Sequence, residues 1–139
     1  MLSQLEQQQV LECIAAAEAA TSGELRVHLE AQCAKDPIER AIDLFDKLGM
    51  QATNERNGVL IYVAYESKQL AIIGDTGINN LVPNDFWDSV RDIMVSNFKM
   101  GQLSEGLCAA ITEAGQQLAK YFPPRENDQN ELPNQISFG

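Results

Sequence analysis

Residues 58–74 read GVLIYVAYESKQLAIIG, two apolar runs separated by a mostly polar stretch. The first run, 58–64, is apolar throughout, which is typical of a central strand covered on both faces. The stretch 65–69 predicts a hairpin turn, and 70–74 predicts the strand that follows it. The rest of the chain can be interpreted outward from this pair of strands.

Upstream, residues 36–48 predict a helix. Asp36 supplies a side-chain cap, Pro37 takes the first helical position and Glu39 lies near the positive helix end. Gly49 then ends the helix. The apolar stripe expected to be buried consists of Ile38, Ala41, Ile42, Phe45 and Leu48.

Residues 24–31 alternate between apolar and polar side chains, which predicts a strand. Leu25, Val27, Leu29 and Ala31 lie on one side, and Glu24, Arg26, His28 and Glu30 on the other. The polar side predicts a wet face near a sheet edge. We expect His28, the single histidine, to be solvated there, since the sequence identifies no Ser or Cys as its fixed partner.

Helical periodicity also marks residues 4–20, 83–100 and 103–122, and Pro123-Pro124 ends the last of these. The order of elements predicts a layered α/β domain in which helices cover a small sheet. We expect this domain to occupy residues 1–123 and the polar tail 124–139 to be extended or mobile.

Composition narrows the class of protein. The chain has 139 residues, of which 45% are hydrophobic and 22% charged, values typical of a single soluble globule. The net charge of −10 repels phosphate backbones and anionic lipids, so nucleic acid is not expected as a partner. An acidic surface attracts cations and basic partners, or simply keeps the protein soluble.

Neither a secretory leader nor an apolar stretch of about 18 residues is present in the sequence as given, so a cytoplasmic chain without membrane insertion is expected. The three cysteines, Cys13, Cys33 and Cys108, are distant from one another and are expected to be reduced.

Asp75-Thr76-Gly77 matches the tripeptide of aspartic proteases, but its context argues against that chemistry. Two such carboxylates in an all-β frame are needed, whereas this segment is followed by helices. One histidine without clustered cysteines gives little support to a zinc site. Phosphate-loop, nucleotide-binding and calcium-loop patterns are also missing from the sequence.

Oxygen-bearing side chains nevertheless gather where loops meet the predicted sheet. They are Glu24, the segment 54–57, Asp75 with Asn79 and Asn80, and Asp85, Asp88 and Asp92 at helical spacing. Hard cations such as Ca²⁺ take six to eight oxygen ligands, so a cation site is one interpretation. The alternative is that Asp85 and Asp88 only stabilise a helix N-terminus.

Several strings resemble the TPM domain family, in particular its short, leaderless bacterial members. They are Thr21 to His28, Leu48-Gly49-Met50, Arg56 to Leu60, Gly74 to Asn79, Phe86-Trp87-Asp88, Tyr121-Phe122-Pro123 and Asn130 to Pro133. The resemblance implies a three-layer α/β/α sandwich with a small central β-sheet covered by helices. It also implies an acidic loop cluster that binds calcium or a similar divalent ion, with Mg²⁺ as the alternative.

Carried onto this sequence, the resemblance makes Glu24, Asn57 and Asp75 the first choices as metal ligands, and Asp85 and Asp88 the second. The family more usually has glycine-tyrosine-glycine where this chain has Gly74-Asp75-Thr76-Gly77, which adds a carboxylate. The tail residues Asp128 and Glu131 also match and are candidate ligands or a cap.

Three functions follow as hypotheses. The first is a divalent-cation-binding or regulatory module in which the ion orders the loops for a protein partner that the sequence does not identify. The second is a metal-dependent acid phosphatase with Asp75 or Glu24 as ligand or base, an activity to which family members have been linked. The third is a protein-interaction domain that needs no metal.

Overall fold

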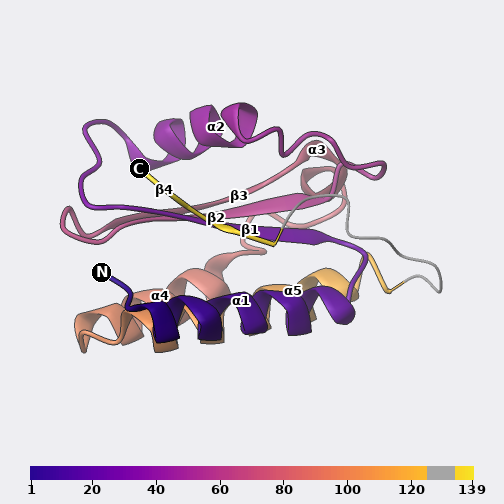
Figure 1. The fold of residues 1–139 in the computed structure, drawn as a ribbon. Helices are drawn as coiled ribbons and strands as arrows, with labels where there is room; N and C mark the ends of the chain where they lie inside the picture. The colour runs from indigo at the N-terminus through magenta and orange to yellow at the C-terminus, as the bar shows by residue number, and fades with distance from the viewer. Residues whose placement is uncertain (125–133) are drawn as a thin grey trace. The chain divides into compact units, whose positions relative to one another are not determined.

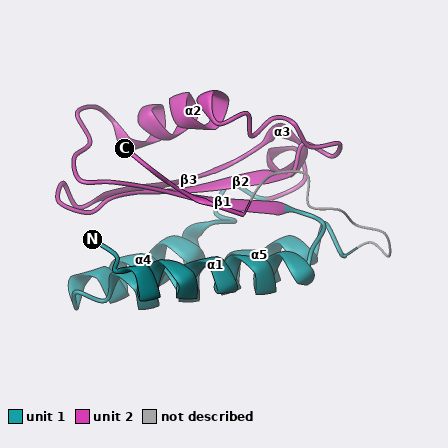
Figure 2. Ribbon diagram, viewed as in Figure 1, with its two compact units in different colours: residues 1–23, 83–129 teal, residues 24–82, 130–139 magenta. Residues whose placement is uncertain are grey.

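The computed structural model describes residues 1–124 and 134–139, which form five helices and four strands (Figure 1). The predicted mixed α/β class is confirmed. The described residues divide into two compact units, coloured separately in Figure 2. A helical unit contains residues 1–23 and 83–124, and a sheet unit contains residues 24–82 and 134–139.

The helical unit consists of α1 (Gln4–Ala19), α4 (Asp88–Lys99) and α5 (Leu103–Ala119). Helix α5 packs against both of the others, and small residues permit close approach at each contact. A Cβ atom at Gly115 would lie 2.9 Å from the Cβ of Ala17 in α1, and one at Gly106 would lie 2.7 Å from the Phe98 ring in α4. Both contacts therefore depend on glycine in α5.

The sheet unit contains β1 (Glu24–Glu30), α2 (Pro37–Lys47), β2 (Gly58–Ala64), β3 (Gln69–Gly74), α3 (Thr76–Asn79) and β4 (Ile136–Phe138). The strand order is β3-β2-β1-β4. Strand β1 runs parallel to both of its neighbours, and β2 and β3 form the predicted antiparallel hairpin. The sheet is thus centred on the segment 58–64, as its apolar composition predicts.

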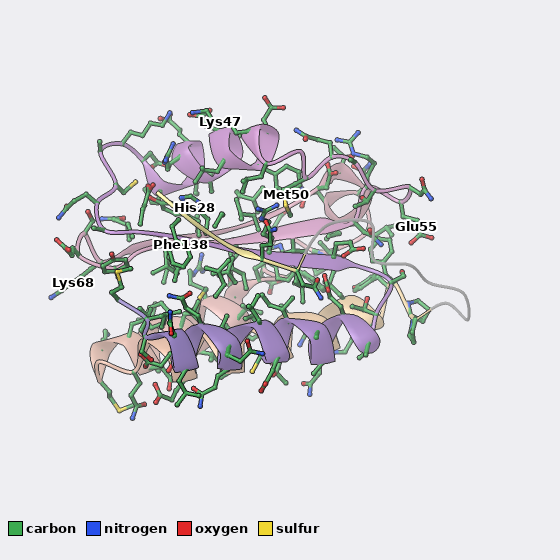
Figure 3. All side chains as sticks on the ribbon, viewed as in Figure 1. His28, Lys47, Met50, Glu55, Lys68 and Phe138 are labelled. Atoms are coloured by element: carbon green, nitrogen blue, oxygen red, sulfur yellow. The ribbon has the colours of Figure 1, made fainter. Side chains whose placement is uncertain are left out.

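Helix α2 packs against β2 and β3, and Met50 lies in the same core beneath it (Figure 3). The helix begins at the Asp36 cap as predicted, but its buried face is rotated relative to the predicted stripe. Ala41, Leu44 and Phe45 are buried, whereas Ile38 and Ile42 are 54% and 53% exposed. The rotation brings Arg40 to Glu30 of β1, an ion pair that apolar periodicity does not reveal.

The prediction of a wet face on β1 is wrong, because all seven residues of this strand are buried. The register pairs Arg26 with Leu60 and His28 with Tyr62, so these polar side chains lie on the face that α2 covers. Nor is β1 at the sheet edge, since β4 from the tail pairs with it. A three-residue strand inside a polar tail gives no periodic signal by which it could be predicted.

No helix in the part of the chain that the structure describes is both long and apolar enough to span a lipid bilayer.

Candidate functional site

The backbones of three of the five predicted ligands meet at one rim of the sheet. The carbonyl of Asn57 accepts a hydrogen bond from the amide of Glu24 at 3.3 Å, and the carbonyl of Gly58 accepts one from the amide of Asp75 at 3.0 Å. The starts of β1 and β2 and the end of β3 therefore meet here. We call Glu24, Asn57 and Asp75 the rim site; all three residues are buried.

Asn57 is held by the turn that precedes β2. Its amide donates to Thr53 Oγ1 at 3.1 Å, and its Nδ2 donates to Glu55 Oε2 at 3.2 Å. Its Oδ1 is fully buried and receives no hydrogen bond from any residue that the structure describes. A buried amide oxygen without a hydrogen-bond donor costs about 1–3 kcal/mol of stability. Such unsatisfied oxygens are unusual in a native core.

Asp75 caps the short helix α3 and is bound by an arginine. Its Oδ1 accepts from the Thr76 amide at 2.7 Å and from Arg56 Nη2 at 2.9 Å, and its Oδ2 accepts from Arg56 Nε at 2.7 Å. This two-point pairing raises the pKa of the Arg56 guanidinium. The negative charge of Asp75 is therefore paired with the positive charge of Arg56 from the same chain.

Gly77 permits the loop that carries Arg56 to lie against α3. Its amide donates to the Arg56 carbonyl at 2.9 Å. A Cβ atom at Gly77 would lie 2.0 Å from the carbonyl oxygen of Glu55 and 2.6 Å from that of Arg56. Arg56 itself has φ +51, a left-handed conformation that is uncommon outside glycine. The rim loop thus has one tightly constrained position.

The second-choice ligands belong to the helical unit. Asp88 is the first residue of α4 and pairs with Arg91 at 2.9 Å, and Asp85 is exposed in the turn before it. The placement of Asp88 matches the alternative in which acidic residues stabilise the helix N-terminus. Asp128 and Glu131 lie outside the described residues.

Across residues 1–124 and 134–139, no three or more His, Cys, Asp and Glu side chains form a group that could hold a metal ion. The rim site has only two carboxylates beside an amide, and Arg56 occupies one of them. The ligand roles of Glu24, Asn57, Asp75, Asp85 and Asp88 stay predictions.

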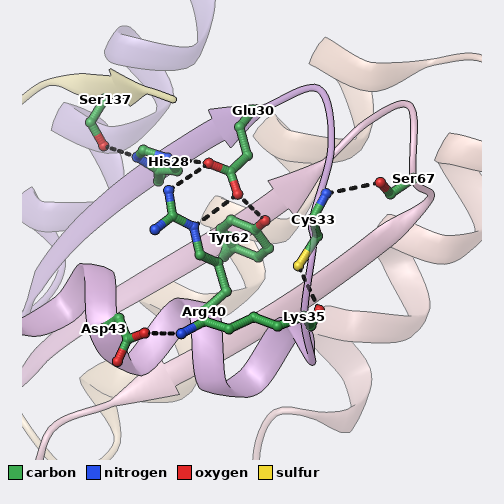
Figure 4. A network of polar contacts seen from close by, with 9 residues as sticks. All are labelled: His28, Glu30, Cys33, Lys35, Arg40, Asp43, Tyr62, Ser67 and Ser137. Carbon is green, nitrogen blue, oxygen red and sulfur yellow. Dashed lines mark hydrogen bonds and ion pairs between the residues drawn. The ribbon is translucent and has the colours of Figure 1, made fainter.

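A second polar cluster, which we call the β1 network, lies toward the other end of β1 (Figure 4). Its members are His28, Glu30, Arg40, Tyr62 and Ser137. Glu30 accepts from Arg40 Nε at 3.0 Å and Nη2 at 2.8 Å, and also from the Tyr62 hydroxyl. Sequence reasoning missed this cluster because its members come from β1, α2, β2 and β4.

The β1 network perturbs the titration of its members. The hydrogen bonds from Arg40 lower the pKa of Glu30 from 4.5 to about 2, with further contributions from Tyr62 and His28. Burial raises the pKa of the Tyr62 hydroxyl. The network therefore holds a permanently ionised Glu30 and a neutral tyrosine at neutral pH.

His28 links the network to β4. Its Nδ1 lies 2.7 Å from Ser137 Oγ and its Nε2 lies 3.3 Å from Glu30 Oε1. The ring stacks on Tyr62 with centroids 6.0 Å apart. A neutral imidazole that donates from Nε2 to Glu30 and accepts at Nδ1 from Ser137 satisfies both contacts.

We expect His28 to make stability depend on pH. Burial is the main cause that lowers its pKa below the ordinary 6.5, although Glu30 opposes the shift. The unfolded chain then binds the proton more readily, so stability is complete above about pH 6.5 and is lost as pH falls through the folded-state pKa. Urea denaturation at several pH values between 5 and 7.5 gives the free energy of unfolding as a function of pH. This free energy should fall more steeply toward low pH in wild type than in His28→Gln; the same pH dependence in both proteins would contradict this account.

Comparison with known proteins gives one family. The model of the TPM domain matches residues 1–117. The solution NMR structure of the BA42 protein from the psychrophilic bacterium Bizionia argentinensis has a TM-score of 0.95 and 47% sequence identity, covering 100% of this chain and 96% of that one. A search of curated proteins finds no match.

A second solved structure shows the same fold at much lower identity. It is the solution NMR structure of the N-terminal domain of the cg2496 protein from Corynebacterium glutamicum, with a TM-score of 0.67 and 12% identity. The alignment covers 98% of this chain and 80% of that one.

Proposed function

Since the chain belongs to the TPM domain family, we propose that it is a divalent-cation-binding module of that family, with calcium as its ion and the rim site as the place of binding. The observation that carries this proposal is the buried Oδ1 of Asn57, which receives no hydrogen bond from the described residues. A bound cation would offset the cost of burying that oxygen.

The donor types at the rim are those that a hard cation takes, although their side chains are not gathered into a metal-binding group in the described structure. Glu24 and Asp75 supply carboxylates, Asn57 supplies an amide oxygen, and the Glu55 carboxylate lies beside it as the acceptor of Asn57 Nδ2. Oxygen ligands of this kind favour Ca²⁺ or Mg²⁺ over softer metals. Bound only to the folded protein, the ion would stabilise the rim loop and present it in one conformation to a partner.

Arg56 gives the proposal a distinctive property. Its guanidinium holds the Asp75 carboxylate at 2.7 and 2.9 Å and would compete with any cation for that group. The side chain is 45% exposed, so it can leave Asp75 for solvent. Asp75 would then bind the ion only after Arg56 has released it, whereas Glu24 and Asn57 would be available to the ion at all times.

We expect millimolar calcium to raise the thermal midpoint of chelator-treated protein by several degrees, because a ligand at 100 times its Kd adds about 2.7 kcal/mol. Asn57→Ala should abolish this rise. Arg56→Gln should strengthen calcium binding, opposite to the usual effect of breaking an ion pair. Asp92→Asn, on an exposed face of α4, is the matched control.

Isothermal titration with CaCl₂ and then MgCl₂ measures the affinities directly. An unchanged midpoint with both ions, or an equal rise in wild type and Asn57→Ala, would rule out the rim site. Weaker calcium binding by Arg56→Gln would contradict the competition between Arg56 and the ion.

A further inference from the structure

The edge of β1 is filled by a short segment whose alternate residues contact buried polar groups. Val27, His28 and Leu29 pair with Ile136, Ser137 and Phe138, and the Gly139 amide donates to the Leu29 carbonyl at 3.0 Å. The ladder contains only three paired residues on each side. Backbone bonds alone therefore hold β4 weakly, and side-chain contacts decide which sequence fits.

Residues 135 and 137 make those contacts through their side chains, and residue 139 fits because it has none. Arg26 Nη2 donates to Gln135 Oε1 at 3.2 Å, and Ser137 Oγ lies 2.7 Å from His28 Nδ1. A Cβ atom at Gly139 would lie 2.3 Å from Glu30 Oε1 and 2.9 Å from His28 Nε2, so only glycine fits there. The edge thus recognises alternate positions, as sites that bind a peptide by strand addition do.

Among the described residues, the hydrogen bonding of the Arg26 guanidinium is incomplete. This residue is 8% exposed, and its buried Nε has no hydrogen-bond acceptor among the residues that the structure describes. Gln135 offers one amide oxygen to a guanidinium that can bind both oxygens of a carboxylate at once. The segment that occupies the edge is therefore a poorer match than one with a glutamate at this position.

We propose that the β1 edge is a binding site for an extended segment of a partner protein with the pattern Glu-x-Ser-x-Gly, and that residues 134–139 of the chain occupy this site when the partner is not bound. The glutamate would pair with Arg26, the serine with His28, and the glycine would lie against Glu30. Such a partner displaces β4 because it satisfies Arg26 fully. This binding is independent of the cation proposed at the rim.

Two hexapeptides test the proposal on the full chain. One has the sequence of residues 134–139, and the other carries Glu in place of Gln135. The chain carries Ser137→Ala, which removes the contact with His28 Nδ1, and Gly139→Val, whose Cβ would lie 2.3 Å from Glu30 Oε1, so its own segment is weakened. Binding is followed by ¹⁵N NMR at the amides of residues 26–29.

The glutamate peptide should bind this variant about tenfold more tightly than the glutamine peptide, because charge-assisted hydrogen bonds are roughly twice as strong as neutral ones. Adding Arg26→Gln should remove that preference. A glutamate peptide whose serine is replaced by alanine should bind more weakly. Circular dichroism confirms that each variant is folded.

Failure of both peptides to bind the folded variant would overturn the proposal. So would equal affinity of the two peptides for a chain with Arg26 intact, or shifts confined to residues far from β1. Wild type should bind the same peptides more weakly than the weakened-segment variant, since its own residues 134–139 compete; tighter binding by wild type would also contradict the proposal.

Discussion

Glu30→Ala is expected to lower the free energy of unfolding by about 3 kcal/mol. Removing one partner of a buried ion pair typically costs about 3–5 kcal/mol, because the other charge stays buried without compensation. Arg40 is 26% exposed and can recover part of its hydration, which places the expected loss at the lower end. The Tyr62 hydroxyl also loses its acceptor. Urea denaturation at pH 7 measures the change.

Glu30→Gln separates the charge from the packing. The pKa of Glu30 falls from 4.5 to about 2 on folding, so its ionisation contributes stability that is present above about pH 4.5 and is lost as pH falls through about 2. A shift of this size corresponds to a contribution on the order of 3 kcal/mol. The difference in stability between wild type and Glu30→Gln should therefore shrink steadily across that pH range.

Glu39→Gln is the matched control, since Glu39 lies on the exposed side of α2. Its stability at pH 7 should fall by no more than about 1 kcal/mol, the upper contribution of an exposed carboxylate in the first turn of a helix. If Glu39→Gln lowered the free energy of unfolding as much as Glu30→Gln, the effect would come from removing any negative charge near α2 and not from the β1 network.

Gly77→Ala should also destabilise the protein strongly, although helix propensity predicts the reverse. Alanine in place of glycine favours a helix by about 1 kcal/mol. Against this, the added methyl would lie 2.0 Å from the Glu55 carbonyl and 2.6 Å from that of Arg56, and neither backbone atom can rotate away. A clash this close lies at the upper end of the about 1–3 kcal/mol that overpacking typically costs, so after the helix gain we expect a net loss of about 2 kcal/mol.

The same substitution should disturb the Arg56–Asp75 pair, because the Gly77 amide fixes the Arg56 carbonyl. Thermal unfolding gives the stability, and the Arg56 Nε–H signal in NMR reports the pair. Gly74→Ala is a useful comparison, since its Cβ would meet Ile78 and Asn79 at 3.4–3.5 Å, ordinary contact distances. Gly77→Ala as stable as wild type would mean that the rim loop is not tightly packed.

Local patterns predicted the elements well where one segment contains the whole signal. The apolar run 58–64, the alternation in 24–31 and the Asp36-Pro37 helix start each lie within a few residues, and β2, β1 and α2 follow them closely. Periodicity could not reveal which face of α2 is buried. That orientation depends on Arg40 reaching Glu30, a contact between distant residues.

The candidate sites show the same limit. Loop position predicted that Glu24, Asn57 and Asp75 would meet, and their backbones do so. No local pattern predicts that Arg56 binds Asp75, because this pair depends on a left-handed residue and on the close approach of Gly77. The alternation in β1 predicts a solvated His28. This fails because the strand that pairs with this part of β1 comes from residue 136 onward, far away in the sequence. A solvent-exposed strand face and a face covered by polar partners from distant segments show the same alternation of apolar and polar residues.

The division of the chain into units bears on the order in which the protein can form during synthesis. Helix α1 is synthesised before the other described elements, yet its packing partner α5 lies at residues 103–119. Strands β1 to β3 and α2 lie within residues 24–82 and can form their contacts while the later helices are still being made. Residues buried in this helix, such as Val10 and Ile14, therefore lack their α5 partner until residue 119 has been made, which makes residues 4–19 the segment most exposed to aggregation during synthesis.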